Sequence, residues 1–140
     1  MLVVENLSKV EVVDGKKYKY SYKLIQSYFP RKVTDGIINV NSYGIEVERQ
    51  DVIENNVVNI ERESIVNISP YRHKVHNLLK LIYDNSVSPI HLIEVLGDYI
   101  DEYTSDYNSP ENNYIEELKR TSMWLKGEDS LSFFMVKYSL

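Results

Sequence analysis

The first half of the chain alternates between hydrophobic and polar residues with the two-residue period of half-buried strands. Within Lys17–Leu24, tyrosines and a leucine share one face, while lysines and a serine share the other. Shorter or less regular apolar runs lie at 10–13, 37–49 and 57–68. Asp14-Gly15, between the first two runs, is a strong hairpin signal because both residues tolerate the positive φ of a tight turn. Four runs with short connections predict an antiparallel meander.

Two irregularities bear on this predicted sheet. Pro30 is expected to end the second strand, because proline cannot donate a ladder hydrogen bond, and 31–36 is expected to form a polar loop. In the third run the apolar residues change parity near its middle. A bulge near Asn41-Ser42 would turn both apolar sets toward the core, and Gly44 could serve the bend equally well.

Helical spacing replaces the alternation between Ser69 and Tyr103. Ser69-Pro70 and Ser88-Pro89 each combine a capping serine with a proline at the first helical position, where a missing N–H costs nothing. Apolar residues then recur every three or four positions. They are Tyr71, Val75, Leu78, Leu79, Ile82 and Tyr83 in the first run, and Leu92, Ile93, Leu96, Tyr99, Ile100 and Tyr103 in the second. The short link at 85–87 predicts an antiparallel helical hairpin.

The last third of the chain predicts one further helix and an apolar end. Ser109-Pro110 repeats the same opening, so a third helix is expected to run to about Lys126 and to stop at Gly127. Leu131–Leu140 is short and apolar, and could form a fifth strand or a segment that packs on a partner, including a second copy in a homodimer. We therefore expect one α+β domain over 1–140: a β-meander at 1–68, the hairpin at 69–103, and the third helix and apolar segment at 104–140. The helices should cover one face of a sheet of four or five strands.

The amino-acid composition limits the kinds of site and the cellular compartment that we expect for this domain. The chain of 140 residues has no cysteine, which excludes disulfides and thiolate metal sites. It has no apolar run of bilayer length and does not begin like a signal peptide. These features favour a cytoplasmic protein without a membrane segment.

Charge is distributed unevenly along the chain. The net charge is −5, and 81–118 contains no lysine or arginine. In the predicted second helix, Glu94, Asp98, Asp101 and Glu102 could form a docking surface for a basic protein, or mimic nucleic acid toward a DNA-binding protein. The alternative is that the acidic helix only balances the basic first helix, which carries Arg72, Lys74 and Lys80; such surface pairs contribute little.

A metal site is the competing hypothesis. His73 and His76 are neighbours on the surface of the first predicted helix. Folding the hairpin should place them near Asp98 and Asp101, and two imidazoles with a carboxylate could hold zinc or another divalent ion. A metal-dependent enzyme or metal-binding protein would follow, although the basic residues nearby disfavour a bound cation. His91 has no recognisable catalytic partner.

The sequence gives less support to an enzyme or a nucleic-acid-binding protein. The sequence has no nucleophile elbow, phosphate-binding glycine loop or dinucleotide fingerprint, so a non-enzyme without a cofactor is favoured. An acidic second helix would be repelled by DNA. The lysines of the second strand, with Lys16, face away from its tyrosines, which cannot stack on bases beside them. We interpret these lysines as a solvated edge that discourages strand addition. The function best supported is a non-catalytic cytosolic interaction or regulatory module that binds a protein partner.

Several stretches also bear a family resemblance. They are Gly15-Lys-Lys-Tyr-Lys-Tyr20, Tyr43-Gly-Ile-Glu-Val-Glu-Arg49, Ser69–Asp84 and Ser88–Asp98. Over about 16–103 the chain resembles an uncharacterised family of short bacterial proteins, known as a domain of unknown function. The resemblance implies no activity, cofactor or site residue.

Overall fold

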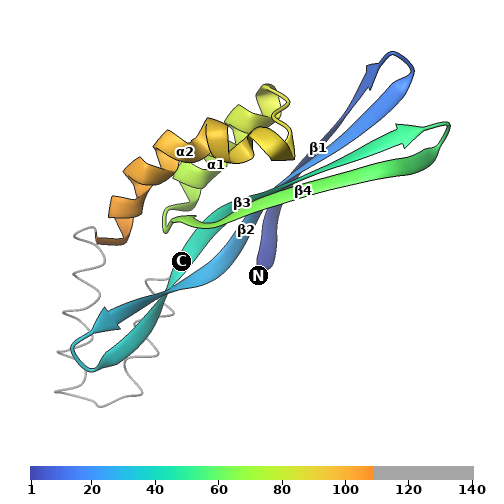
Figure 1. Cartoon of the computed structure of the whole chain (residues 1–140). Helices are drawn as coiled ribbons and strands as arrows, with labels where there is room; N and C mark the ends of the chain where they lie inside the picture. Colours follow the sequence, from blue (N-terminus) through green and yellow to red (C-terminus); the bar gives the residue numbers. More distant parts are fainter. Residues whose placement is uncertain (109–140) are drawn as a thin grey trace.

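The computed structural model describes residues 1–108, which form four strands, two α-helices and two short 3₁₀ helices (Figure 1). In chain order these are β1 (Leu2–Val13), β2 (Lys16–Val33), β3 (Gly36–Ile53), β4 (Asn56–Ser69), α1 (Arg72–Asp84), η1 (Pro89–His91), α2 (Leu92–Tyr103) and η2 (Thr104–Asn108). The predicted third helix at 109–126 and the apolar segment at 131–140 lie outside the described residues. A fifth strand therefore stays a prediction.

The strands form one sheet in the order β1-β2-β3-β4, and all neighbours are antiparallel. The predicted meander and the α+β class are confirmed. Asp14 and Gly15 have φ values of 52° and 79°, as a tight two-residue hairpin turn requires. Glu54 and Asn55, at 51° and 65°, make the corresponding turn between β3 and β4.

The strands are longer than the alternation predicted. β1 begins at Leu2 rather than Val10, and β2 continues through Pro30 to Val33. The prediction that Pro30 ends β2 is wrong, because β1 pairs with β2 only as far as Gln26. Beyond that point no strand of residues 1–108 pairs with this side of β2, where the donor that proline lacks is not needed. The β2–β3 hairpin consequently extends past the helices as a two-stranded arm (Figure 1).

The main irregularity of the sheet lies in β4 and not at Asn41-Ser42. β2 and β3 pair without a break across that site, whereas β4 has extra residues between the partners of Tyr43 and Ile45. The β4 backbone passes close to Gly44, where an added Cβ would lie 2.2 Å from the carbonyl oxygen of Ile65. A glycine is required there by this close approach of two backbones.

The two apolar sets of β3 consequently enter different clusters. Ile45 and Val47 belong to the main core beneath the helices. Ile38 and Val40 are buried on the arm, where Val33 packs against them. The predicted bulge, which was to turn both sets toward one core, is therefore wrong.

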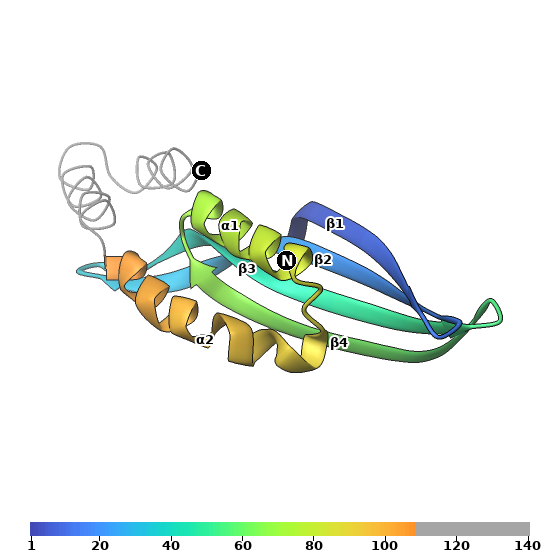
Figure 2. The same cartoon turned by 90° about the horizontal axis from the view of Figure 1, so that it is seen from above.

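Both α-helices lie on one face of the sheet and run antiparallel (Figure 2). α1 contacts β2, β3 and β4, and α2 contacts β4. Their apolar sides meet the tyrosine face of β2 in a core that includes Tyr20, Tyr22, Leu24, Ile45, Val47, Ile68, Val75, Leu79, Ile82, Leu92 and Leu96. No helix within residues 1–108 is long and apolar enough to span a membrane.

Lys17, Lys19 and Lys23 of β2 lie on the face opposite the helices. Lys17 and Lys19 are exposed, while Tyr20 and Tyr22 are buried, so the predicted facing of this strand is confirmed. The interpretation that these lysines protect an edge is wrong, because β2 lies between β1 and β3. The edges of the sheet are β1 and β4.

Candidate functional site

Four carboxylates form one stripe along α2. Glu94, Asp98, Asp101 and Glu102 are separated by four, three and one residues, a spacing that places them on one side of a helix. All four are exposed. We call these four residues the α2 acidic stripe.

Exposed apolar side chains adjoin the stripe. Leu92 and Leu96 are fully buried and anchor the other side of α2. Ile93 and Tyr99 were predicted to join them, but they are 59% and 38% exposed. The prediction failed because α2 lies along β4, at the edge of the sheet, so that only a narrow side of the helix meets the core. Ile90 of η1, which is 75% exposed, adds to this surface.

The basic residues of α1 do not neutralise the stripe. Arg72 pairs with a glutamate of β1, Lys74 with an aspartate of η2 and Lys80 with the last residue of α1, at 3.4, 2.8 and 3.9 Å between the charged atoms. Within residues 1–108, Glu94 is the one stripe residue with an ion-pair partner, His91 at 3.4 Å. The alternative in which the acidic helix balances the basic helix is not the arrangement found.

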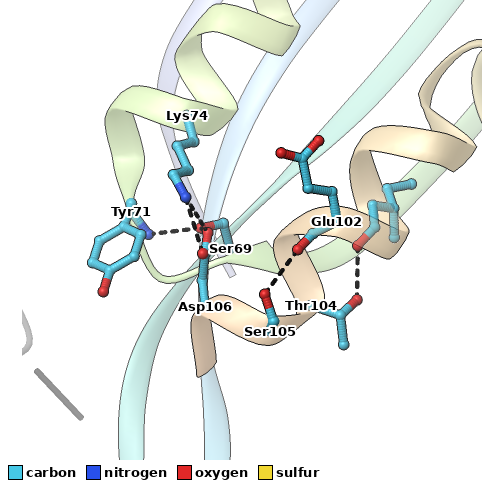
Figure 3. Close-up of polar contacts among 8 residues, drawn as sticks. Ser69, Tyr71, Lys74, Glu102, Thr104, Ser105 and Asp106 are labelled. Atoms are coloured by element: carbon cyan, nitrogen blue, oxygen red, sulfur yellow. Dashed lines mark hydrogen bonds and ion pairs between the residues drawn. The ribbon is translucent and has the colours of Figure 1, made fainter. Parts of the chain in front are cut away.

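A polar cluster fastens the end of α2 to the start of α1 (Figure 3). Lys74 Nζ lies 2.9 and 2.8 Å from the two carboxylate oxygens of Asp106, and Ser69 Oγ donates to the same carboxylate at 3.0 Å. The hydrogen bond to Asp106 raises the pKa of Lys74, so this lysine stays protonated at neutral pH. We call Ser69, Lys74 and Asp106 the helix latch.

The latch also explains why Ser69 is not the helix cap that the sequence predicted. Its hydroxyl accepts a hydrogen bond from the Tyr71 N–H at 3.1 Å, two residues on. α1 then begins at Arg72, with Tyr71 as N-cap and no side-chain capping bond. At the second Ser-Pro pair, Ser88 does occupy the N-cap of η1, again without a side-chain bond.

Two side-chain hydroxyls donate hydrogen bonds to backbone carbonyls at the C-terminal end of α2. Thr104 Oγ1 donates to the Ile100 carbonyl at 2.7 Å, and Ser105 Oγ donates to the Glu102 carbonyl at 3.0 Å (Figure 3). The Ile100 carbonyl also accepts the backbone N–H of Thr104, so the hydroxyl adds a second bond at this helix end. The last turn of α2 has no basic residue, although cations are favoured at that end.

The candidate metal-binding histidines have different surroundings. His76 Nδ1 lies 2.6 Å from Glu5 Oε1 on β1, and His73 is exposed. The predicted neighbours Asp98 and Asp101 belong to α2, which contacts β4 rather than β1. Among the described residues, no three His, Asp or Glu side chains are grouped to hold a metal ion.

Two buried tyrosines serve the structure of the core. The Tyr22 hydroxyl donates to the Val87 carbonyl at 2.9 Å, and the Tyr107 hydroxyl bonds to Ser42. Burial raises the pKa of Tyr22 and raises that of Tyr107 to about 12. Both hydroxyls are therefore neutral at physiological pH, and neither is prepared to act as a base.

A shallow hollow of about 260 Å³ opens between β4 and η1. It is lined by Glu61, Arg62, Glu63, Pro89 and Ile90. Because α2 begins directly after η1, the hollow adjoins the N-terminal end of the helix that bears the stripe. Its two carboxylates and its exposed isoleucine match the character of the stripe.

A family model matches residues 1–102, well over half of the chain. The chain belongs to DUF6514, a family of unknown function. The resemblance noted in the sequence is confirmed, and the DUF6514 match begins at residue 1 rather than near residue 16. No curated protein and no solved structure matches the chain. The DUF6514 region ends at Glu102, so it contains the whole stripe but not Asp106 of the latch.

The latch and the exposure of the apolar residues of α2 were not predicted from the sequence. Leu92, Leu96 and Ile100 form a strict four-residue series, and Ile93 and Tyr99 each lie one position outside it. That narrower series would have identified which residues face the core. The latch has no comparable signal, because Lys74 and Asp106 are 32 positions apart.

Proposed function

We propose that this DUF6514 protein is a non-catalytic, cytosolic interaction module that binds a basic protein partner through the α2 acidic stripe. The observation that carries the proposal is that Asp98, Asp101 and Glu102 are exposed and form no ion pair within residues 1–108. Ile93 and Tyr99 beside them supply apolar area, which interfaces need in addition to charge.

The carboxylates of the stripe lower the stability of α2, and this loss supports a role in binding. Carboxylates three or four positions apart repel one another on a helix. Asp101 and Glu102 also lie near the C-terminal end of the helix, where negative charge is unfavourable. α2 tolerates both effects because Leu92 and Leu96 anchor it in the core. A surface that costs stability, and most of whose charges form no ion pair within residues 1–108, is typical of one kept for binding.

The chemistry of the surface defines the partner. Carboxylates next to exposed isoleucine and tyrosine fit a segment that presents lysine or arginine beside apolar side chains, as a basic amphipathic helix does. In the hollow near the start of α2, Glu61 is paired with Arg49 at 3.2 Å, and Glu63 is the further carboxylate beside Ile90. Nucleic acid would be repelled by such a surface.

The ionisable groups of the interior support a non-catalytic role. An acid–base catalyst works best with a pKa near the working pH. Lys74 has a raised pKa and is protonated, and burial keeps the Tyr22 and Tyr107 hydroxyls neutral. The latch residues and the buried hydroxyls form hydrogen bonds within the fold. The outer side of α2 therefore remains for binding.

The test compares two isosteric triple variants that remove the same charge. One is Asp98→Asn, Asp101→Asn, Glu102→Gln on the stripe. The matched control is Asp14→Asn, Asp35→Asn, Glu54→Gln, at three exposed hairpin positions. Partners are captured from the producing cells with the unchanged chain, purified, and titrated against all three proteins at low and high salt.

The stripe variant should bind at least about tenfold more weakly and lose most of the salt dependence, because the attraction is electrostatic. The hairpin variant should bind like the unchanged chain. If every captured partner binds the stripe variant with unchanged affinity at low salt, the proposal is wrong.

A further inference from the structure

Among residues 1–108, the edge strand β1 has no strand paired along its outer side. It pairs with β2, and no other strand within residues 1–108 pairs with it. It has twelve residues and no proline. Figure 2 shows β1 along one margin of the sheet, with its far half extending beyond α1. Val10, Val12 and Val13 in that half are 57%, 63% and 50% exposed. A long edge strand with exposed valines and no proline can serve as a template for adding another strand.

The order of side chains along β1 is complementary to itself. In an antiparallel pair of identical strands, residues equally distant from the twofold axis lie opposite each other. An axis at Val10 places Lys9 opposite Glu11 of a second copy, and Glu11 opposite its Lys9. Leu7 then lies opposite Val13 on the helix side of the sheet. Opposite charges and apolar pairs across strands are both stabilising.

Other registers of β1 lack this match. An axis at Lys9 or at Glu11 sets a charge against its own copy. An axis at Leu7 places Lys9 opposite Glu5, which already binds Arg72 of α1. That register places Val10 opposite Val4, the extra residue of the irregularity between Val3 and Glu5, so the pairing is interrupted on both strands.

The other edge, β4, is not complementary to itself in its charged part. An axis at Arg62 places Glu61 opposite Glu63 and sets two arginines together. An axis at Glu61 sets two glutamates together, and an axis at Ile60 places Val58 opposite Arg62. Like charges opposite each other destabilise a strand pair.

We propose that two copies of this chain form a twofold dimer in which β1 pairs antiparallel with β1 around Val10, joining two four-stranded sheets into one. Within the monomer Lys9 bonds to the Tyr83 carbonyl and Glu11 accepts from Ser86, just after α1, so both side chains lie on the helix side of β1. The cross-strand ion pairs would form on that side of the joined sheet. α2 lies over the opposite edge, so the dimer presents two acidic stripes and would bind a divalent basic partner with avidity.

The register can be read from disulfide formation, since the chain has no cysteine of its own. In Val10→Cys the two thiols lie directly opposite, at a separation that a disulfide can close. In the matched control Val12→Cys, on the same strand, they lie about 13 Å apart along the strands and cannot be joined. Under mild oxidation of the full chain, Val10→Cys should give a covalent dimer and Val12→Cys should not. Equal cross-linking of both, or none at Val10→Cys, would overturn the proposal.

Charge reversal tests the ion pairs independently of oxidation. Sedimentation equilibrium should find that the unchanged chain dimerises, and that Lys9→Glu or Glu11→Lys raises the dissociation constant about tenfold or more, since each creates two like-charge pairs. The double variant Lys9→Glu, Glu11→Lys should recover tight association, which simple damage to the monomer would not do. Glu63→Lys on β4 should leave the dimer unchanged. An unchanged chain that stays monomeric at all concentrations, or a double variant as weak as the singles, would contradict the dimer and leave β1 to a strand from another protein.

Discussion

α1 and α2 are similar in length and packing but differ on their outer sides. α1 has 13 residues, α2 has 12, and each buries a narrow apolar side against the same face of the sheet. The charged residues Arg72, Lys74 and Lys80 of α1 each have an acidic partner within the fold. Of the four stripe carboxylates of α2, three have no ion-pair partner among residues 1–108.

The basic residues of α1 form ion pairs that stabilise the fold, whereas most carboxylates of the stripe form no ion pair within residues 1–108. Arg72 and Lys74 reach β1 and η2, elements that are distant in the chain, whereas Lys80 pairs with Asp84 within α1. The stripe makes no such connection, and its charges lie where the helix end disfavours them. We therefore expect mutations on α1 to affect stability and mutations on the stripe to affect binding.

The largest effect on stability should come from substitutions on the buried sides of the helices, where α1 and α2 are alike. Leu79→Ala in α1 and Leu96→Ala in α2 should each lower the free energy of unfolding by about 2–5 kcal/mol, because both side chains are fully buried. Denaturant titration measures both. A loss at Leu79 with almost none at Leu96 would show that α2 is docked too loosely to present a fixed surface.

A smaller loss is expected when the helix latch is broken. Lys74→Met keeps much of the side-chain length but removes the charge that Asp106 binds, and should lower the free energy of unfolding by about 1 kcal/mol, since the pair is partly solvated. The pKa of Lys74 is raised above the ordinary 10.5 in the folded state. Its contribution is therefore complete below pH 10.5 and is lost as the pH rises through the folded pKa.

Unfolding curves of wild type and Lys74→Met at several pH values check this dependence. The difference in free energy between the two proteins should be constant near neutral pH and should shrink in strong alkali. A difference that instead disappears on moderate acidification would assign the effect to another group.

Neutralising the stripe should have the smallest effect on stability. Asp98→Asn, Asp101→Asn, Glu102→Gln should leave the free energy of unfolding within about 0.5 kcal/mol of wild type, or slightly raise it, because repulsions on the helix are relieved. Thermal unfolding at low salt measures the change. A clear loss of stability would mean that the stripe has a structural partner, as the charges of α1 have.

The sequence predicted those parts of the fold that depend on local pattern. The alternation in Lys17–Leu24, the Asp14-Gly15 turn and the helical spacing after Ser69 each depend on neighbouring residues, and each gave the correct element. Pro30 was misread because its effect depends on where β1 stops pairing, a long-range property. The position of the sheet irregularity was misread for a similar reason, since it follows from how β4 passes over Gly44.

The candidate site was predictable in its residues but not in its surroundings. The spacing of Glu94, Asp98, Asp101 and Glu102 was sufficient to place them on one side of a helix. Which charges they meet depends on the position of α1 above the sheet, and this position brings Arg72 to β1 instead of to α2. The exposure of Ile93 likewise depends on α2 lying over the edge strand β4.

Mapping the bound partner onto the two helices tests most directly whether the α2 acidic stripe is the binding surface. A photoreactive residue is placed at Ile93 on α2 or at Asn77 on α1, both of which are exposed. The two proteins are then irradiated in the cells that produce them. We expect a basic protein to cross-link at residue 93 and not at residue 77, and the stripe substitutions to abolish this product. Equal cross-linking at both positions, or a product at residue 93 that survives neutralisation of the stripe, would contradict this expectation.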